Sequence, residues 1–196
     1  MKEETLPRRV AELRTAHPDA TLEVWAEDEH RVGLRPILRR VWARRGTHPR
    51  ALVRPRYEWL YLVAFVCPES GKSSFWLLPT ISAALFQLVL EAFAQEQGVG
   101  PNKRILLVLD QAGWHVAREI MPPEGLGLIF LPPYSPELMP VERIWTLTDE
   151  DLVNRTFESL NELAEVLGRR CASLDAAPEK LSACTLYHWW PRVAAA

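Results

Sequence analysis

Three carboxylates stand at positions where a folded chain could use them for chemistry. Asp28 ends the alternating segment LEVWAED, Asp110 ends the apolar run RILLVLD, and Glu142 follows the last proline of YSPELMPVERIW. Each Asp is in phase with the apolar face of its segment, where a carboxylate is costly unless a cation or hydrogen bonds hold it. Oxygen ligands of this kind suit Mg²⁺ or Mn²⁺ and not zinc. One or two such ions, held by all three carboxylates, could clamp the attacking and leaving oxygens of a phosphoryl transfer.

Each carboxylate also has a purely structural explanation. Either Asp alone could cap a helix or close a turn, and Glu142 could be stabilised by the dipole of the helix that it begins. The three together are better explained as a joint site, because two strand ends and one rigid helix start would meet at the same edge of a sheet. We therefore predict Asp28, Asp110 and Glu142 as the catalytic and metal-binding residues.

The elements that must position these carboxylates follow from the hydrophobic pattern. Strands are predicted at residues 21–29, 57–68, 71–79, 103–110 and 126–132. Helices are predicted at residues 7–17, 82–98, 114–121, from about 140, 159–174 and 177–189. Pro140 is expected at the first helical position, which places Glu142 in the first turn. Hairpins followed by β-α-β units predict an α/β fold with a mixed five-stranded sheet and helices on both faces.

Arginine is concentrated between residues 31 and 56, a segment that we call the Arg block. It contains nine Arg and no Asp, Glu or Lys, although the whole chain has a net charge of −2. Its Gly and Pro residues predict short strands or a hairpin with loops. Arg suits bidentate contact with phosphate, so the block predicts binding to DNA; the alternative is a solvated face neutralised by acidic neighbours. The predicted DNA-binding residues are Arg31, Arg35, Arg39, Arg40, Arg44, Arg45 and Arg50.

The composition argues against several classes of protein. Hydrophobic residues make up 48% of the 196, as in a globular domain and not in a disordered chain. The longest apolar run, LYLVAFVC, is too short to cross a bilayer, and the N-terminus lacks the apolar core of a signal peptide. No membrane partner is therefore predicted, and a cytoplasmic location is expected. Three widely spaced Cys argue against a disulfide framework or a zinc site.

Four motifs connect this chain to a known family. VWAEDEHRVGL, VWARRGTHP, LLVLDQAGWH and LIFLPPYSPELMPVERIW, in this order, resemble the catalytic domain of bacterial insertion-sequence transposases of the mariner-like superfamily. The resemblance covers roughly residues 20 to 160. It implies a ribonuclease H-like fold, a DDE metal triad at the same three carboxylates, and cut-and-paste transposition of DNA. The family usually has Asn where this chain has Met139, and it often has Lys near Thr148.

The resemblance also implies partners. The family's helix-turn-helix modules are expected to be absent before residue 20, so that residues 1–196 would form a single catalytic domain with C-terminal helices at about 158–190. A separate helix-turn-helix chain could then recognise the transposon ends. A homodimer is expected in the active complex, associated with the bacterial nucleoid. His115 matches a position where the family often has His, which makes it a candidate accessory residue near the metal or DNA; packing is the alternative.

Two functions remain open at this point. The first is a metal-dependent DNA transposase and endonuclease, and the second is a catalytically silent DNA-binding or dimer-forming remnant of one. A ribonuclease H-like or resolvase-type nuclease unrelated to transposition would share the chemistry, but the motif YSPELMPVERIW argues against it. Within that motif, Tyr134 and Trp145 are expected to pack in the turn and the core and not to stack on bases.

Overall fold

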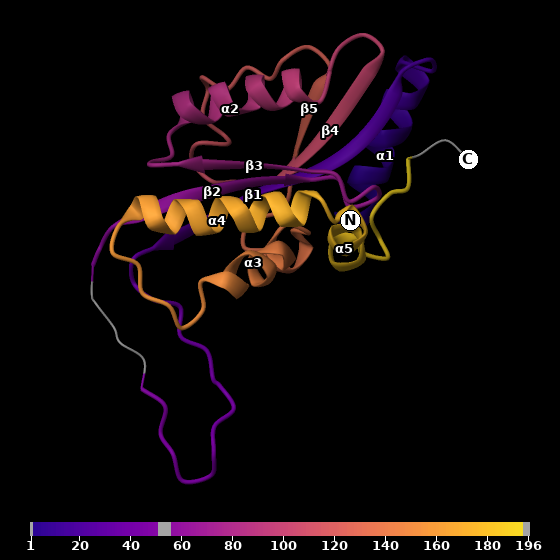
Figure 1. Ribbon diagram of the computed structural model, residues 1–196. Coiled ribbons are helices and arrows are strands. Elements are labelled where there is room, and N and C mark those ends of the chain that lie inside the picture. The colour runs from indigo at the N-terminus through magenta and orange to yellow at the C-terminus, as the bar shows by residue number, and fades with distance from the viewer. Residues whose placement is uncertain (1, 51–55, 194–196) are drawn as a thin grey trace.

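A mixed five-stranded sheet forms the centre of the computed structural model, which describes residues 2–50 and 56–193 (Figure 1). The strands lie in the order β3-β2-β1-β4-β5. Their bounds are β1 Thr21–Gly33, β2 Trp59–Val66, β3 Ser73–Leu78, β4 Lys103–Leu109 and β5 Leu126–Phe130. Because β1 pairs antiparallel with β2 and parallel with β4, the prediction of a mixed sheet is confirmed.

Both faces of the sheet are covered, because its central strands are apolar on both sides. In β1, Val24 and Ala26 belong to one core, whereas Trp25 belongs to the other and contacts Phe93 of α2. Helix α2 covers the face of the sheet on which Trp25 lies, and the other helices cover the opposite face of the sheet (Figure 1). The helices are α1 Lys2–Ala16, α2 Ala83–Glu96, α3 Glu142–Thr148, α4 Leu160–Asp175 and α5 Pro178–Thr185.

Serine side chains explain where two of the long helices begin. Ser82 Oγ accepts a hydrogen bond from the Leu85 N–H at the start of α2, and Ser159 Oγ accepts one from the Glu162 N–H at the start of α4. Such caps satisfy N–H groups that the first turn of a helix leaves without a partner. Among the described residues, no helix has both the length and the apolar character needed to span a membrane.

The helix predicted at residues 114–121 is not formed. This segment is a series of turns, and side chains hold backbone groups that a helix would otherwise use. Gln87 of α2 donates to the Met121 C=O at 2.9 Å and accepts from the Met121 N–H at 2.8 Å. These contacts fix the end of the segment against α2 as an irregular turn, so the prediction from helical spacing is wrong here.

The last two parts of the chain also differ from the expected boundaries. Helix α3 begins at Glu142, two residues after Pro140, because the proline-rich chain enters it through a tight turn closed by the Ile144 N–H and the Val141 C=O at 2.8 Å. Glu142 nevertheless lies in the first turn, as predicted. Helix α5 ends at Thr185, before the expected residue 189, since the backbone there leaves the helical conformation.

Residues 34–50 of the Arg block project from the sheet as a long loop (Figure 1). Strand β1 continues to Gly33, beyond the predicted end at residue 29. Residues 34–50 then contain no helix or strand, so short strands are absent from this described part of the block. The alternative, a hairpin, is confirmed, because β1 and β2 on either side of the block pair antiparallel. Arg54 lies outside the described residues. The loop is anchored by Asn154, which accepts from the Arg39 N–H at 3.0 Å and donates to the Arg39 C=O at 3.1 Å.

Candidate active site

Two parallel strands bring Asp28 and Asp110 to the same edge of the sheet. Ala26 of β1 pairs with Val108 of β4. Asp28 lies two residues further along β1, and Asp110 lies two residues after Val108, directly after the end of β4. Both Asp residues are in phase with this pair, since side chains alternate along a strand. The carboxyl ends of parallel strands are where α/β sheets place their sites. The pairing therefore places the two acids next to each other.

A pocket of about 430 Å³ opens at this edge and is lined by all three predicted carboxylates, Asp28, Asp110 and Glu142. The rest of its wall comes from the segments that follow β4 and β5. These lining residues are Gln111, Ala112, Leu131, Pro132, Pro133, Tyr134, Ser135, Pro136 and Met139. The structure thus brings the three acids together in one pocket.

Glu142 is positioned by the proline-rich segment between β5 and α3. Tyr134 has a φ of 56°, in the left-handed region, so the chain turns sharply there. Met139, Val141 and Ile144 are buried and hold the start of α3 against the core, while Glu142 stays exposed at the pocket. Tyr134 itself is 101% exposed. The expectation that it packs in the turn is therefore wrong, because the turn directs its ring into solvent.

Asp28 lies beside Trp145, whose Nε1–H donates to Asp28 Oδ2 at 3.1 Å. Trp145 is buried, as expected, and His30 stacks on it at 5.1 Å. Burial, and then the charges of Glu142 and Glu29, raise the pKa of Asp28 to about 7, although the Trp145 hydrogen bond opposes this. Asp28 and Glu142 line the same pocket, where their negative charges repel each other.

Asp110 has the opposite electrostatic environment in the same pocket. Its Oδ1 accepts a hydrogen bond from His115 Nδ1 at 2.7 Å and another from the Ala112 N–H at 2.8 Å. The hydrogen bond from His115 holds the pKa of Asp110 below its usual value, against the effect of partial burial. Carboxylates with pKa values shifted in opposite directions are typical of functional sites.

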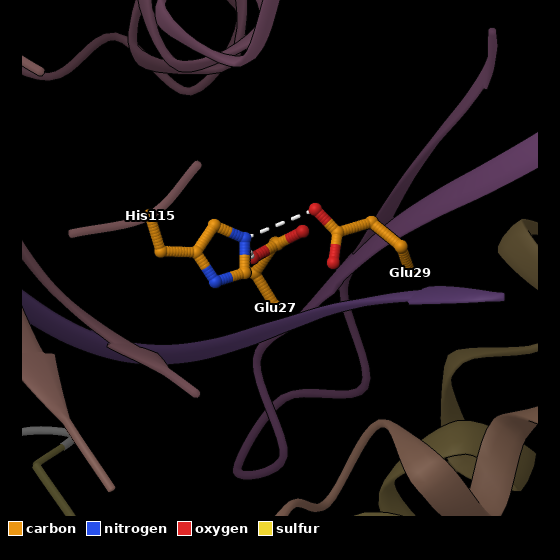
Figure 2. Close-up of side chains that lie close together, drawn as sticks. All are labelled: Glu27, Glu29 and His115. Atoms are coloured by element: carbon orange, nitrogen blue, oxygen red, sulfur yellow. Dashed lines mark hydrogen bonds and ion pairs between the residues drawn. The ribbon is translucent and has the colours of Figure 1, made fainter. Parts of the chain in front are cut away.

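His115, which contacts Asp110, forms a largely buried cluster with Glu27 and Glu29. Figure 2 shows these three side chains. His115 Nε2 lies 3.0 Å from Glu29 Oε1 and 3.4 Å from Glu27 Oε2. Burial and the charge of Glu29 raise the pKa of Glu27 well above its usual value. Burial alone would lower the pKa of His115, but the charge of Glu27 and the hydrogen bonds with Asp110 and Glu29 raise it to about 11. The cluster therefore favours a doubly protonated imidazole between acids.

The two glutamates of this cluster are not among the predicted site residues. They alternate with Asp28 along β1 and share the phase of Trp25, which packs beneath α2. Two acids in phase with an apolar Trp could have indicated a buried polar cluster. The sequence of β1 does not reveal their partner, however, because His115 is 86 residues away from Glu29. His115, the candidate accessory residue, contacts Asp110 and is only 1% exposed, so it lies within the protein and not on its surface.

The seven Arg residues predicted to bind DNA are all exposed. The Arg31 guanidinium lies over the Trp59 ring at 5.1 Å, and Arg39 lies 3.7 Å from Asp149. None of the seven lines the carboxylate pocket. Arg31 and Arg35 instead line a second pocket of about 440 Å³ at the base of the Arg block, together with His30.

Comparisons with known proteins agree with this arrangement. The family model for the DDE superfamily endonuclease matches residues 23–164. An uncharacterized protein of Sinorhizobium fredii, y4pE/y4sA, is 34% identical over 132 residues, which are 67% of this chain and 96% of that protein.

Solved structures with a similar fold include complexes of the Mos1 transposase. The Mos1 mariner paired-end complex with Mn has a TM-score of 0.59 at 16% identity, over 95% of this chain and 62% of that chain. The Mos1 paired-end complex with the left transposon end has a TM-score of 0.58 at 17% identity, over 93% of this chain and 60% of that chain. This likeness shows the predicted ribonuclease H-like fold. The chain spans about three fifths of the Mos1 chains, and the family match over residues 23–164 shows that it belongs to the DDE superfamily endonucleases.

Proposed function

We propose that this chain is the catalytic domain of a metal-dependent DNA transposase, an endonuclease and strand transferase. It would cut and join DNA phosphodiesters at transposon ends by in-line phosphoryl transfer. The observation that supports this most is the single pocket lined by Asp28, Asp110 and Glu142 at the carboxyl edge of the sheet. The similar Mos1 structures include complexes with a transposon end, with Mg and with Mn.

The donor atoms of the pocket suit a hard divalent cation. All three acids offer oxygen, which Mg²⁺ and Mn²⁺ prefer. The charge of Glu142 raises the pKa of Asp28, so the pocket concentrates negative charge that a cation would relieve. Asp28, Asp110 and Glu142 would hold one or two Mg²⁺ or Mn²⁺ ions. Bound there, the ions would stabilise charge on the attacking and leaving oxygens of the phosphoryl group.

The protein residues around these acids have a positioning task. Trp145 donates to Asp28, and the Ala112 N–H donates to Asp110, so two of the three carboxylates are held by hydrogen bonds. Asp110 and Glu142 are the exposed acids of the pocket, and Glu142 comes from a helix, not from the sheet. A phosphodiester would therefore approach from the side of these two acids.

The Arg block is the proposed contact with the DNA backbone. Its exposed guanidinium groups would position a duplex through phosphates, which fixes orientation but does not read sequence. Recognition of the transposon ends would then come from elsewhere, for example a separate helix-turn-helix chain. Joining two ends also favours a homodimer in the active complex, since a twofold assembly presents two equivalent pockets.

The direct test is cleavage of labelled DNA with Mn²⁺ and with EDTA. The matched variants are Asp110→Asn, in the pocket, and Asp19→Asn, an exposed acid outside it. We expect Mn²⁺-dependent strand cleavage that Asp110→Asn reduces by at least about 100-fold, since even indirect partners of a metal are worth 10–100-fold. Asp19→Asn should cleave like the wild type.

The same experiment decides between the two candidate functions. DNA binding without cleavage, at any Mn²⁺ concentration, would contradict the enzyme and identify a catalytically silent remnant. Equal cleavage by the wild type and Asp110→Asn would show that the activity does not come from this pocket.

A further inference from the structure

The cluster of Glu27, Glu29 and His115 has no task in the proposed function so far. Glu27 is 0% exposed and His115 is 1% exposed, and both lie on the α2 side of the sheet, where the Phe86 ring contacts the His115 ring at 4.4 Å. Burying ionisable groups in an apolar core is costly unless they are paired. Their burial next to the pocket therefore requires an explanation.

The contacts of His115 form a continuous path from β1 to the pocket. Its Nε2 lies 3.0 Å from Glu29 Oε1, and its Nδ1 lies 2.7 Å from Asp110 Oδ1. Trp114 Nε1–H also donates to Glu29 Oε1, at 2.7 Å. Because a carboxylate only accepts hydrogen bonds, both ring nitrogens of His115 act as donors along this path.

The contacts of Asp110 show what this path does. The hydrogen bonds from His115 Nδ1 and from the Ala112 N–H both end on Oδ1. They fix the rotation of the carboxylate and leave Oδ2 for a ligand in the pocket, which Asp110 lines. A carboxylate ligand is commonly oriented by such a hydrogen-bonded partner behind it, and loss of that partner weakens metal binding.

We propose that His115 is a positioning residue, which orients Asp110 for metal binding and is itself held by Glu29 and Glu27. This inference rests on the proposed metal site. Glu29 fixes the ring through its hydrogen bond, and Trp114 fixes Glu29. Glu27 makes no hydrogen bond with the described residues, but its Oε2 lies 3.4 Å from Nε2 and so contributes a second contact to the ring.

A metal ion inside the cluster is the competing explanation. Ligand atoms of Glu27, Glu29 and His115 lie within 4.8 Å of one another. The geometry favours the positioning role, because Nε2 already lies at hydrogen-bond distance from Glu29, and Glu27 and His115 are buried. The experiment below separates the two explanations.

The test compares two replacements of His115 that each keep one of its donors. The amide nitrogen of His115→Asn takes the place of Nδ1, facing Asp110, whereas that of His115→Gln reaches the place of Nε2, facing Glu29. Mn²⁺ binding is measured without DNA, from the electron paramagnetic resonance signal of the free ion. We expect His115→Gln to weaken Mn²⁺ binding about tenfold and His115→Asn less than about threefold. His17→Gln, in the segment between α1 and β1, is the matched control and should bind like the wild type.

Each other outcome has a defined meaning. Wild-type affinity in His115→Gln, with binding lost in Asp110→Asn, would overturn the positioning role but keep the metal site. Binding that survives in an Asp28→Asn, Asp110→Asn double variant but disappears in His115→Gln would place the metal in the cluster and also overturn it. No binding by the wild type would contradict the proposed function itself.

If His115→Gln does not fold, His115→Gly with added imidazole replaces it, and the proposal requires imidazole to restore Mn²⁺ affinity.

Discussion

Asp28 and Asp110 differ as single residues, although they line the same pocket. Burial and neighbouring carboxylates raise the pKa of Asp28 to about 7, whereas the hydrogen bond from His115 lowers the pKa of Asp110. Near neutral pH and without metal, Asp110 is ionised while Asp28 is divided between its two forms. Asp28 must lose its proton before it can act as a ligand, so metal affinity should rise with pH up to about 7.

The raised pKa of Asp28 also predicts how stability depends on pH without metal. In the folded state Asp28 keeps its proton up to about pH 7, but in the unfolded chain it loses the proton near its usual pKa of about 4. The folded state therefore binds more protons in this window, and the free energy of unfolding falls as pH rises. Asp28 contributes at most about 1.4 kcal/mol per pH unit to this fall.

Urea unfolding in EDTA between about pH 4.5 and 6.5 measures this effect. The stability of the wild type relative to Asp28→Asn should decrease as pH rises, because the variant has no proton to lose at this position. Asp19→Asn, at an exposed position, should keep the wild-type slope. Equal slopes for the wild type and Asp28→Asn would contradict the raised pKa.

At the scale of elements, α3 and the turn after it connect the pocket to the Arg block. Glu142 begins α3, and Asp149 follows its last residue. Asp149 pairs with His30 at 3.0 Å and with Arg39 at 3.7 Å, close to the anchor at Asn154. One short helix thus presents an acid to the pocket at one end and holds the base of the Arg loop at the other. DNA bound to the loop would therefore lie near the pocket.

The role of the Arg block is tested by the salt dependence of DNA affinity. The double variant Arg44, Arg45→Ala removes two exposed guanidinium groups from the loop, and the control Arg8, Arg9→Ala removes two from α1. Each lost phosphate contact should flatten the slope of log affinity against log salt by about 0.9. We expect the loop variant to lose up to about 1.8 in slope on all DNA sequences and the control to lose none. Equal slopes for the two variants would show that the loop does not contact phosphate.

At the scale of the whole molecule, the sequence predicts the sheet well because its strands have strong patterns. Ile105, Leu106 and Leu107 of β4 are each 0% exposed, as a continuous apolar run predicts for a strand covered on both faces. The phase of Asp28 and Asp110 predicts that they lie on the same face, and their positions at the ends of apolar segments predict that they share an edge. Patterns of this kind depend on the local chain and on sheet geometry, and both can be read from the sequence.

The remaining features depend on contacts between distant parts of the chain. The helix predicted at residues 114–121 is replaced by turns because Gln87, 34 residues away, holds Met121. The buried cluster requires His115 and Glu29, which are 86 residues apart. Contacts between side chains that are far apart in the sequence can prevent a helix that the local hydrophobic spacing predicts. No periodicity within a segment predicts such contacts.

The central claim is that Asp28, Asp110 and Glu142 form one metal site, and a crystal structure with Mn²⁺ tests it most directly. Data collected at the manganese absorption edge identify each Mn²⁺ ion by its anomalous signal. The account predicts one or two anomalous peaks in the pocket, with an oxygen of each of the three acids at about 2.0–2.6 Å from a peak, and no peak there in Asp110→Asn. A peak only among Glu27, Glu29 and His115, or a Glu142 carboxylate turned away from an occupied pocket, would contradict it.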